Sequence, residues 1–550
     1  MTLALSFLGP ARPYLIQYVL DVPLPAGDMG GVRFWIVVMV VLTAVQTLVN
    51  YLQISWSHKL GESVVDDLRR QVFNHIVRLR PQFFDKTPVG ALQTRVVSDV
   101  ETLNSLFSEG FISIFGELLQ LFTLLALMFY TDFRLTLVAM IPIPLLILST
   151  YVFKVKVNAA FQRVRKAVAE INTFLQEHIT GMLVVQIFNQ EKREYDKFEK
   201  INARHRDAHL DTVFYYSVFF PVVEVIAAFS TAALVWYGSG AVLEGYTTFG
   251  TLVAFLMYLT MFFRPIRMLA DRFNTLQLGL VSGERIFNIL DTQEFIRDGE
   301  NEDFHPVSPK IDFRNVRFSY VEGQEVLKGL DFTVPPGKTT AFVGATGSGK
   351  STVVSLLMRF YELSEGQILI DGMDIRTVKL KSLRGAMGLV LQDVFLFSGT
   401  ILDNVTLFNG AISEDRVRRA AELIGADAFI ERLPGGYRFE VGERGANLST
   451  GQRQILAFMR VLVYDPKILL LDEATANIDP ESEALIQNAV AVALSGRTSI
   501  VVAHRLSTIQ KADQILVMRR GEIIEAGNHQ TLLALDGHYK KLYRLQYATV

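Results

Sequence analysis

Long apolar stretches alternate with polar stretches through the first half of the chain. Six apolar stretches approach or reach the roughly 20 residues that a helix needs to cross a bilayer, and they predict six membrane spans. The predicted spans lie near Thr2–Val22, Phe34–Gln53, Phe111–Tyr130, Leu135–Phe153, Val213–Val242 and Phe249–Phe263. The first span contains Pro10, Arg12 and Pro13, so a cleaved signal peptide is the alternative. It lacks the basic start and small-residue cleavage site of such a peptide, and we expect the chain to begin inside a longer helix.

Basic residues are concentrated in two of the links between these spans. The link between the second and third spans and the link between the fourth and fifth are long and rich in Lys and Arg. The loops on the other side are short and hold little that is basic beyond Arg33 and Arg134. We expect a multi-pass protein of the plasma membrane, of the bacterial inner-membrane type. In such proteins the cytoplasmic loops carry the excess of Lys and Arg. Both long links and the C-terminal half would then be cytoplasmic.

The two long links have the composition of helices rather than loops. Residues Ser57–Leu79 and Asn158–Asp211 are rich in Leu, Val, Ala, Glu, Arg and Lys, and such a composition favours helix. A helix from Phe34 to Leu79 would be about 70 Å long at 1.5 Å per residue, so we expect the spans to continue far into the cytoplasm. Polar interruptions near Phe83–Gly90 and Asn189–Phe198 predict two tips that dock on a cytoplasmic domain.

Several predicted spans contain polar or ionisable residues, which are costly in a bilayer and usually face protein or water. Glu224 lies in the fifth span, Glu117 and Gln120 in the third, and Gln46 and Asn50 in the second. These residues either line a transport pathway or bond a neighbouring helix. Glu224 is favoured over Glu117 as a pathway residue.

The pattern changes after Leu290. Residues Asp291–Pro309 are polar, with an acidic run and two prolines, as is typical of a linker. Short apolar runs then alternate with helical stretches, and several of the runs predict strands of a buried parallel sheet. These runs are Ala341–Val343, Ile368–Ile370, Ile468–Leu471 and Ser499–Ala503. We therefore predict an all-α transmembrane domain over residues 1–293, a linker over 294–309 and an α/β domain over 310–550.

Composition excludes several classes of protein. The 550 residues are 50% hydrophobic and 20% charged, with mean hydropathy +0.28, which excludes a disordered chain. No cysteine is present, which excludes disulfides, thiolate metal sites and a cysteine nucleophile. The net charge of −2 gives no basic field, so we expect no nucleic-acid partner.

A glycine-rich loop follows the predicted strand Ala341–Val343. The run Gly344-Ala345-Thr346-Gly347-Ser348-Gly349-Lys350-Ser351 matches the full P-loop pattern, and Thr352–Phe360 has the character of the helix that follows it. Backbone N–H groups of such a loop surround phosphates, while Lys350 would reach the β- and γ-phosphates and Ser351 would ligate Mg²⁺. The sequence therefore predicts a site for a nucleoside triphosphate and magnesium.

Two more predicted strands are followed by residues whose side chains could bind magnesium or transfer protons. Asp472 and Glu473 follow Ile468–Leu471. The first would hold magnesium, and the second is placed to orient or deprotonate an attacking water. His504 ends the strand Ser499–Ala503 at an edge where side chains face the ligand crevice, although such a histidine on its own is more often structural.

These motifs together resemble those of ABC exporter half-transporters of the multidrug and lipid type, over essentially the whole chain. The matching residues are Tyr320 (the aromatic that stacks on adenine), Gln392-Asp393 (Q-loop), Glu440–Gly445 (X-loop), Leu448-Ser449-Thr450-Gly451-Gln452 (the LSGGQ signature), Asp472–Thr475 (Walker B), Asp479 (end of the D-loop) and His504 (switch histidine). In the first half, Phe83-Phe84-Asp85, Gly90, Arg95 and Asp99 match the first cytoplasmic loop.

The resemblance implies a fold and a mechanism. A six-helix transmembrane domain precedes an α/β P-loop ATP-binding-cassette domain, and two such chains form a dimer. Two ATP molecules bind between the cassettes, each between one chain's P-loop and the other chain's signature, and closure opens the membrane cavity outward. The two predicted tips would dock near Gln392 and Glu440–Gly445.

The resemblance also assigns roles to residues, with ATP and Mg²⁺ as cofactors. Catalysis would fall to Glu473, His504 and Gln392, and magnesium to Ser351, Gln392 and Asp472. The nucleotide would contact Tyr320, Gly344, Thr346, Gly347, Ser348, Gly349, Lys350, Ser351, Thr352, Ser449, Gly451, Gln452 and Asp479.

Three features depart from the family pattern. Thr450 stands where the signature usually has Gly, the D-loop reads Ala476-Asn477-Ile478-Asp479, and the usual amphipathic helix before the first span is missing. An intact catalytic glutamate beside an altered signature is typical of exporters with one impaired site. We therefore expect a heterodimer with a second half-transporter, with a homodimer whose signature tolerates Thr as the alternative.

The expected function is ATP-driven export of a hydrophobic or amphipathic substrate, whether drug, lipid or peptide, with membrane lipid as a further partner. An ATP-gated channel or regulator on the same scaffold is the alternative. The six predicted spans argue against a soluble ABC ATPase. An importer is disfavoured because importers normally keep the membrane and ATPase parts on separate chains.

Overall fold

The computed structural model describes residues 1–301, 304–472, 480–503 and 506–547. Contacts within the chain separate it into two compact units. The helical unit comprises Met1–Val77 and Val89–Thr292, and the α/β unit comprises Arg78–Pro88 and Gln293–Val550. A short segment from the middle of the first long link therefore belongs to the α/β unit, although the helices on both sides of it do not.

The helical unit is built from long helices, and each of the six predicted spans lies on one or two of them. The helices are α1 (Thr2–Asp21), α2 (Met29–Ile76), α4 (Val89–Thr94), α5 (Val100–Ser105), α6 (Ile112–Thr131), α7 (Phe133–Met140), α8 (Ile143–Thr180), α9 (Met182–Ile187), α10 (Glu191–Leu243) and α11 (Phe249–Leu290), with π-helical turns at Arg95–Asp99 and Leu106–Phe111. With 48 residues in α2 and 53 in α10, these helices reach about 70–80 Å. They are much longer than a bilayer is thick, as the composition of the long links predicts.

Four helical runs among the described residues are long and apolar enough to cross a membrane. They are Met29–Ile76, Val89–Thr131, Phe133–Thr180 and Glu191–Leu243. The first and sixth predicted spans lie on α1 and on Phe249–Phe263 of α11, and neither stretch meets that test on its own.

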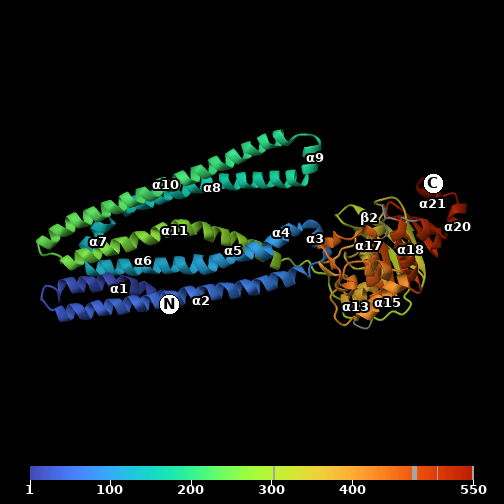
Figure 1. Ribbon diagram of the computed structural model, residues 1–550, viewed down its shortest axis with the longest axis horizontal. Coiled ribbons are helices and arrows are strands. Elements are labelled where there is room, and N and C mark those ends of the chain that lie inside the picture. The colour runs from blue at the N-terminus through green and yellow to red at the C-terminus, as the bar shows by residue number, and fades with distance from the viewer. Residues whose placement is uncertain (302–303, 473–479, 504–505, 548–550) are drawn as a thin grey trace. The chain divides into compact units, whose positions relative to one another are not determined.

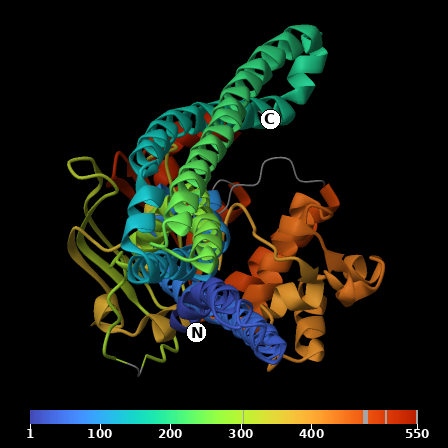
Figure 2. The ribbon, with the colours of Figure 1, turned by 90° about the vertical axis from the view of Figure 1, so that its left-hand side faces the viewer.

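The long helices pack against one another over much of their length. α1 contacts α2, α6 and α11, while α8 and α10 form an antiparallel pair joined at one end by α9 (Figure 1). Viewed along the bundle, α1 and α2 lie side by side (Figure 2). Buried side chains that include Leu124, Val223 and Tyr258 form a core between α6, α10 and α11.

The second long link turns earlier than the sequence predicts. We expect a tip at Asn189–Phe198, but the turn lies between the end of α8 at Thr180 and the start of α10 at Glu191, with α9 inside it. Most of that prediction is wrong, because Glu191 and Glu194 occupy the first turn of α10. Acidic side chains there are stabilised by the helix dipole, so a polar cluster marks a helix start and not a loop.

The α/β unit joins parallel and antiparallel sheets. Its strands are β1 (Ile311–Ser319), β2 (Glu325–Val334), β3 (Thr339–Val343), β4 (Glu365–Ile370), β5 (Met373–Asp374), β6 (Met387–Val390), β7 (Gly399–Thr400), β8 (Glu440–Val441), β9 (Ile468–Asp472), β10 (Thr498–Val502), β11 (Gln514–Arg519) and β12 (Glu522–Gly527). The described strands form a six-stranded sheet of order β12-β11-β3-β10-β9-β6, a four-stranded sheet of order β2-β1-β4-β5, and the pair β7-β8.

Helices surround these sheets. They are α3 (Pro81–Lys86), α12 (Lys350–Leu357), α13 (Leu380–Gly385), α14 (Ile401–Thr406), α15 (Glu414–Ile424), α16 (Asp427–Glu431), α17 (Thr450–Tyr464), α18 (Pro480–Leu494), α19 (Leu506–Lys511), α20 (His529–Ala534) and α21 (His538–Tyr547), with 3₁₀ turns at Ile375–Thr377, Gly436–Arg438 and Glu443–Gly445.

Both faces of the six-stranded sheet are buried. Along β9, Ile468 and Leu470 enter a core shared with the four-stranded sheet, whereas Leu469 and Leu471 enter a second core with α15, α17 and α18. β3, β6, β9, β10 and β11 pair in parallel. The uninterrupted apolar run of β9 follows from this double burial, because alternate side chains of a strand face opposite sides. The predicted buried parallel sheet is confirmed.

One predicted strand belongs to the other sheet. Ile368–Ile370 lies in β4, which pairs antiparallel with β1 and β5. Asp371 and Gly372 join β4 to β5 with φ values of +52° and +82°, the backbone of a tight two-residue hairpin. An Asp-Gly pair after a strand signals a hairpin, so assigning this run to the parallel sheet is wrong.

The segment predicted to be a linker lies along the α/β unit. The Asn301 N–H donates to the carbonyl of Thr377 at 3.0 Å, and the Lys379 N–H donates to the carbonyl of Asn301 at 2.9 Å. Phe304 is buried in the core between the sheets. These contacts fix the described part of the segment to the domain that follows it.

Candidate nucleotide-binding site

The glycine-rich loop connects β3 to α12 in the way that the sequence predicts. Gly347 and Gly349 have φ values of +78° and +102°, a left-handed backbone that glycine adopts without a steric penalty. A Cβ on Gly344 would collide with the carbonyl of Met518. These glycines let the loop close tightly.

Lys350 closes this loop from the first turn of α12. Its side chain is buried, and its Nζ donates to the carbonyl oxygens of Gly344 at 2.8 Å and Ala345 at 3.1 Å. Burial lowers the pKa of the Lys350 ammonium, and the nearby negative charge of Asp472 partly opposes that shift. An ammonium held by two carbonyls at the mouth of a helix N-terminus is suited to an incoming phosphate.

Ser348 provides an independent indication that the loop holds an anion. Its Oγ is buried and, among the described residues, has no hydrogen-bond partner. A buried hydroxyl without a partner costs about 1–3 kcal/mol. A phosphate oxygen in the loop would accept from this hydroxyl and remove that cost.

The sheet brings Asp472 to the same edge as the P-loop. β10 lies between β3 and β9, and Val502 of β10 is paired with Phe342 on one side and Asp472 on the other. The carboxyl ends of these parallel strands therefore meet beside the loop. Ser351 is exposed in the first turn of α12. A hydroxyl and a carboxylate are oxygen donors of the kind Mg²⁺ prefers, with phosphate and water completing its shell.

Three predicted site residues, Glu473, Asp479 and His504, lie outside the described residues. Their roles stay predictions. Elsewhere, within the part of the chain that the structure describes, no group of three or more His, Asp or Glu side chains could hold a metal ion by itself.

Tyr320 lies beside the P-loop helix. Its hydroxyl donates to Oγ1 of Thr352 at 3.2 Å. Phe318 and Tyr361 pack against its ring in edge-to-face geometry, with centroid distances of 4.8 Å and 5.0 Å. The residue remains 39% exposed. The ring is thus held firmly while part of it stays open to a stacking partner.

Tyr361 is a site residue that the motif search missed. Its hydroxyl donates to Oδ2 of Asp85, on the short helix α3. Burial raises the pKa of Tyr361, and the hydrogen bond to Asp85 raises it further. Tyr361 therefore contacts both residues: its hydroxyl bonds the Asp85 carboxylate, and its ring packs against Tyr320. The aromatic pair Phe360-Tyr361 just after the P-loop helix was the available signal.

The predicted signature forms the start of α17. Ser449 is the N-cap, and its Oγ accepts from the Gln452 N–H at 3.2 Å while the Gln452 side chain accepts from the Ser449 N–H at 2.9 Å. The buried Gly451 lies in the first turn. The Gln452 amide therefore stabilises its own helix. The helix N-terminus offers the partial positive charge that a phosphate requires.

The side chain of Thr450 is turned toward its own helix. Its Oγ1 accepts a hydrogen bond from Nη2 of Arg453 at 3.2 Å. None of the hydrogen bonds described for Ser449, Thr450 and Gln452 reaches the P-loop. Within the described residues, the signature and the P-loop are thus separate half-sites.

The predicted Q-loop follows β6, and Gln392 is exposed there. Arg460 on α17 bonds the segment that follows Gln392. Its Nη1 donates to the carbonyl of Phe395 at 2.9 Å, and its Nε donates to the carbonyl of Asn404 on α14 at 2.7 Å. Burial lowers the pKa of Arg460. This link between the Q-loop and the signature helix is one that sequence motifs do not reveal, because the accepting atoms are backbone carbonyls.

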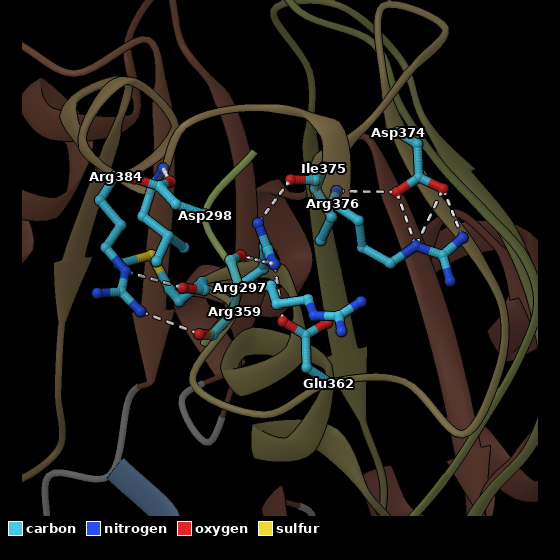
Figure 3. Close-up of polar contacts among 10 residues, drawn as sticks. Arg297, Asp298, Arg359, Glu362, Asp374, Ile375, Arg376 and Arg384 are labelled. Atoms are coloured by element: carbon cyan, nitrogen blue, oxygen red, sulfur yellow. Dashed lines mark hydrogen bonds and ion pairs between the residues drawn. The ribbon is translucent and has the colours of Figure 1, made fainter. Parts of the chain in front are cut away.

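A second buried arginine fastens the segment after α11 to the end of the P-loop helix (Figure 3). Arg359 Nη2 donates to the carbonyl of Arg297 and to Glu362, both at 2.8 Å. Its Nη1 donates to the carbonyl of Ile375 at 3.2 Å. Close by, Oδ1 of Asp298 accepts from the backbone N–H of Leu380 at 2.7 Å.

Comparison with known proteins agrees with this geometry. Residues 1–266 match the family model for the ABC transporter transmembrane region, and residues 327–476 match the model for ABC transporters. The ABC transporter ATP-binding protein YknV of Bacillus subtilis is 39% identical over 98% of this chain and 89% of its own length. The ATP-dependent lipid A-core flippase of Syntrophus aciditrophicus is 37% identical over 100% of this chain and 90% of its own.

A solved structure extends the comparison to the fold. A bacterial Atm1-family ABC exporter with ATP bound superimposes with a TM-score of 0.81 and 29% identity, covering 99% of this chain and 97% of that one. The predicted fold class and the resemblance are confirmed. The chain therefore belongs to the ABC exporter family, as a multi-pass half-transporter whose cytoplasmic ATP-binding domain drives export across a membrane.

Proposed function

We propose that ATP is hydrolysed where this chain's P-loop face meets the signature of a second half-transporter. The supporting observation is the loop itself, with Lys350 held by two loop carbonyls and the buried Ser348 hydroxyl lacking a partner among the described residues. The exposed N-terminus of α17 would serve the partner's nucleotide in the same way. Each chain thus contributes to two ATP sites, with its P-loop face in one and its signature in the other.

We assign the remaining roles on the same basis. Ser351, Asp472 and Gln392 would hold Mg²⁺, which supplies neutralisation of phosphate charge when bound. Glu473 follows Asp472 directly in the sequence, so it would orient and deprotonate the attacking water, with His504 assisting. Tyr320 would stack on adenine, and Thr352 would hold the tyrosine hydroxyl.

We propose that the substrate is hydrophobic or amphipathic and leaves the cytoplasmic side of the plasma membrane. A flippase that acts on lipid A-core is among the relatives, and the basic long links place the cassette inside the cell. Movement would follow alternating access, driven by closure of the two cassettes on ATP.

We propose that the partner is a different half-transporter. Thr450 adds a side chain at a position where glycine allows a close approach of backbone to phosphate. The Thr450–Arg453 hydrogen bond supports the alternative homodimer, because it holds the hydroxyl against the chain's own helix.

Expression of the chain alone, followed by ATPase measurement, separates these assemblies. A heterodimer predicts little activity from the chain alone and recovery on co-expression with a partner half-transporter that lacks its own catalytic glutamate. A stable dimer of this chain with two hydrolysing sites would establish the homodimer. Loss of activity in Lys350→Met under either arrangement would locate the hydrolysis in this chain's P-loop.

A further inference from the structure

The helical unit contains a cavity whose lining is mainly polar. It has a volume of about 520 Å³ and lies between α1, α2, α6 and α11. Gln46, Asn50 and Gln53 line it from α2, and Glu117 and Gln120 line it from α6. Glu224, which the sequence favours as the pathway residue, is not among its lining residues, whereas Glu117 is.

The cavity lies toward the cytoplasmic half of the predicted spans. Gln46–Gln53 forms the last part of the second span, which runs inward, and Glu117 and Gln120 lie in the first half of the third, which runs outward. Polar side chains at membrane depth are costly and mark a pathway by default. A molecule taken from the inner leaflet would reach this cavity first.

The charges of the lining balance each other. Arg12 and Glu117 are its only described ionisable residues, one of each sign, and amides and hydroxyls make up most of the rest. An amide side chain offers two donor hydrogens and a carbonyl acceptor. A site for a cation would carry excess carboxylate and a site for a phosphate would carry excess Lys or Arg. Because the two opposite charges cancel and amides and hydroxyls outnumber them, the lining instead matches a group that has no net charge and many hydroxyls.

An apolar groove adjoins the polar cavity. It has a volume of about 850 Å³, and Arg12, Thr43 and Thr47 line both spaces. The rest of the groove is mostly aliphatic, and it includes the exposed side chains of Val40 and Leu48. One face of α2 therefore carries polar positions and the adjacent face carries apolar ones. Both volumes lie in the range typical of ligand sites.

From this pairing we infer that the cavity binds the uncharged, polyhydroxylated head of a lipid. An acyl chain of the same molecule occupies the adjoining groove. The ligand class is a glycosyl diacylglycerol or a lipid of equivalent chemistry, taken up from the inner leaflet. The inference rests on the proposed export of an amphipathic substrate and narrows its class.

Binding to the assembled transporter in phosphatidylcholine nanodiscs tests the inference. The probes are monoglucosyl diacylglycerol, the same diacylglycerol without sugar, and phosphatidylglycerol with matched chains. We expect the glucosyl lipid to bind at least about tenfold more tightly than either of the others, since several hydrogen bonds to the sugar hydroxyls would distinguish it. Equal binding of the sugar-free lipid, or tighter binding of phosphatidylglycerol, would overturn the inference.

Variants locate the bound head group. Gln46→Leu and Gln120→Leu remove hydrogen bonds from the cavity and should each weaken glucosyl lipid binding about three- to tenfold. Gln17→Leu is the matched control, because Gln17 bonds Thr251 and does not line the cavity. Weakening by Gln17→Leu alone would contradict the assigned location.

Basal ATPase activity of every variant is measured in parallel. Normal hydrolysis without selective glucosyl lipid binding would refute the inference and leave the proposed function intact. Selective binding of the glucosyl lipid without any ATP hydrolysis would support the inference and refute the proposed function. Because the comparison of probes uses the wild-type protein, a variant that fails to fold does not decide the outcome.

Discussion

Lys350 shows how single residues are prepared for a ligand. Its ammonium is buried, bonded to two carbonyls of its own loop and influenced by the charge of Asp472. The P-loop could be identified from sequence because glycine spacing and the lysine are local properties of the chain. The Ser348 hydroxyl, which has no partner among the described residues, could not be identified in this way, since its burial depends on packing by distant strands.

The first prediction concerns Glu473. Glu473→Gln keeps the size and hydrogen bonding of the side chain but removes the base, so turnover should fall by roughly 10²-fold or more while ATP binding survives. Steady-state ATPase rates and a nucleotide-binding isotherm of the assembled transporter provide the two readouts. Near-normal turnover in this variant would assign the base elsewhere.

Tyr320 gives a second prediction at the same scale. Tyr320→Ala removes the stacking surface and should weaken ATP binding by roughly five- to a hundredfold, as loss of an aromatic–base stack of 1–3 kcal/mol implies. Tyr320→Phe is the control, because it loses only the hydrogen bond to Thr352 and keeps the ring. Unchanged binding in Tyr320→Ala would make the residue a structural tyrosine.

At the scale of elements, the short helix α3 is the clearest case of long-range organisation. It lies in the α/β unit, and its Asp85 accepts from the hydroxyl of Tyr361, a residue 276 positions away in the chain. The sequence indicates a docking tip near Phe83–Gly90 from its polar interruption. It does not specify the receiving residue, because the aromatic pair Phe360-Tyr361 does not by itself indicate that α3 packs there.

Removal of this contact should uncouple transport from hydrolysis. Tyr361→Phe deletes the hydroxyl bonded to Asp85 but keeps the ring against Tyr320, so ATP binding should change less than twofold. We expect the ratio of substrate transported to ATP hydrolysed to fall several-fold. Asp85→Asn retains an accepting oxygen, so this ratio should fall less in that variant. An unchanged ratio in Tyr361→Phe would exclude a coupling role.

Arg359 gives a prediction about stability at this scale. Arg359→Met removes charge-assisted hydrogen bonds to the backbone carbonyls of Arg297 and Ile375 and to the carboxylate of Glu362 (Figure 3). Loss of such buried bonds costs about 2–3 kcal/mol, so the Tm of the α/β unit, measured in the full-length chain, should drop by roughly 3–5 °C. Arg376→Met is the matched control. Its side chain is 41% exposed, and its hydrogen bonds within the described residues go to its neighbour Asp374, so its effect should be below about 1 kcal/mol.

The segments predicted less accurately were those where local pattern and tertiary context disagree. The polar cluster at Glu191–Phe198 begins a helix, and Ile368–Ile370 joins an antiparallel sheet. Apolar runs predict burial well, because burial on both faces requires them. They do not reveal which strand lies alongside, since pairing direction is set by turns such as Asp371-Gly372.

At the scale of the whole molecule, the chain is one half of a transporter. The long helices of the helical unit and the P-loop and signature of the α/β unit are each complete as folds, yet the described hydrogen bonds of the signature do not reach the P-loop. We therefore expect a second chain to enclose each ATP. The sequence implied this dimer through its family motifs, whereas the choice between homodimer and heterodimer depends on a surface that one chain does not contain.

Accumulation of a fluorescent amphiphile in inside-out vesicles is the most direct test of ATP-driven export. With the assembled transporter, we expect accumulation above the outside concentration with ATP, and none with ADP or with Glu473→Gln. An ATP-gated channel would only equilibrate the amphiphile. Accumulation that never exceeds equilibrium, or that persists at full rate without hydrolysis, would contradict ATP-driven export.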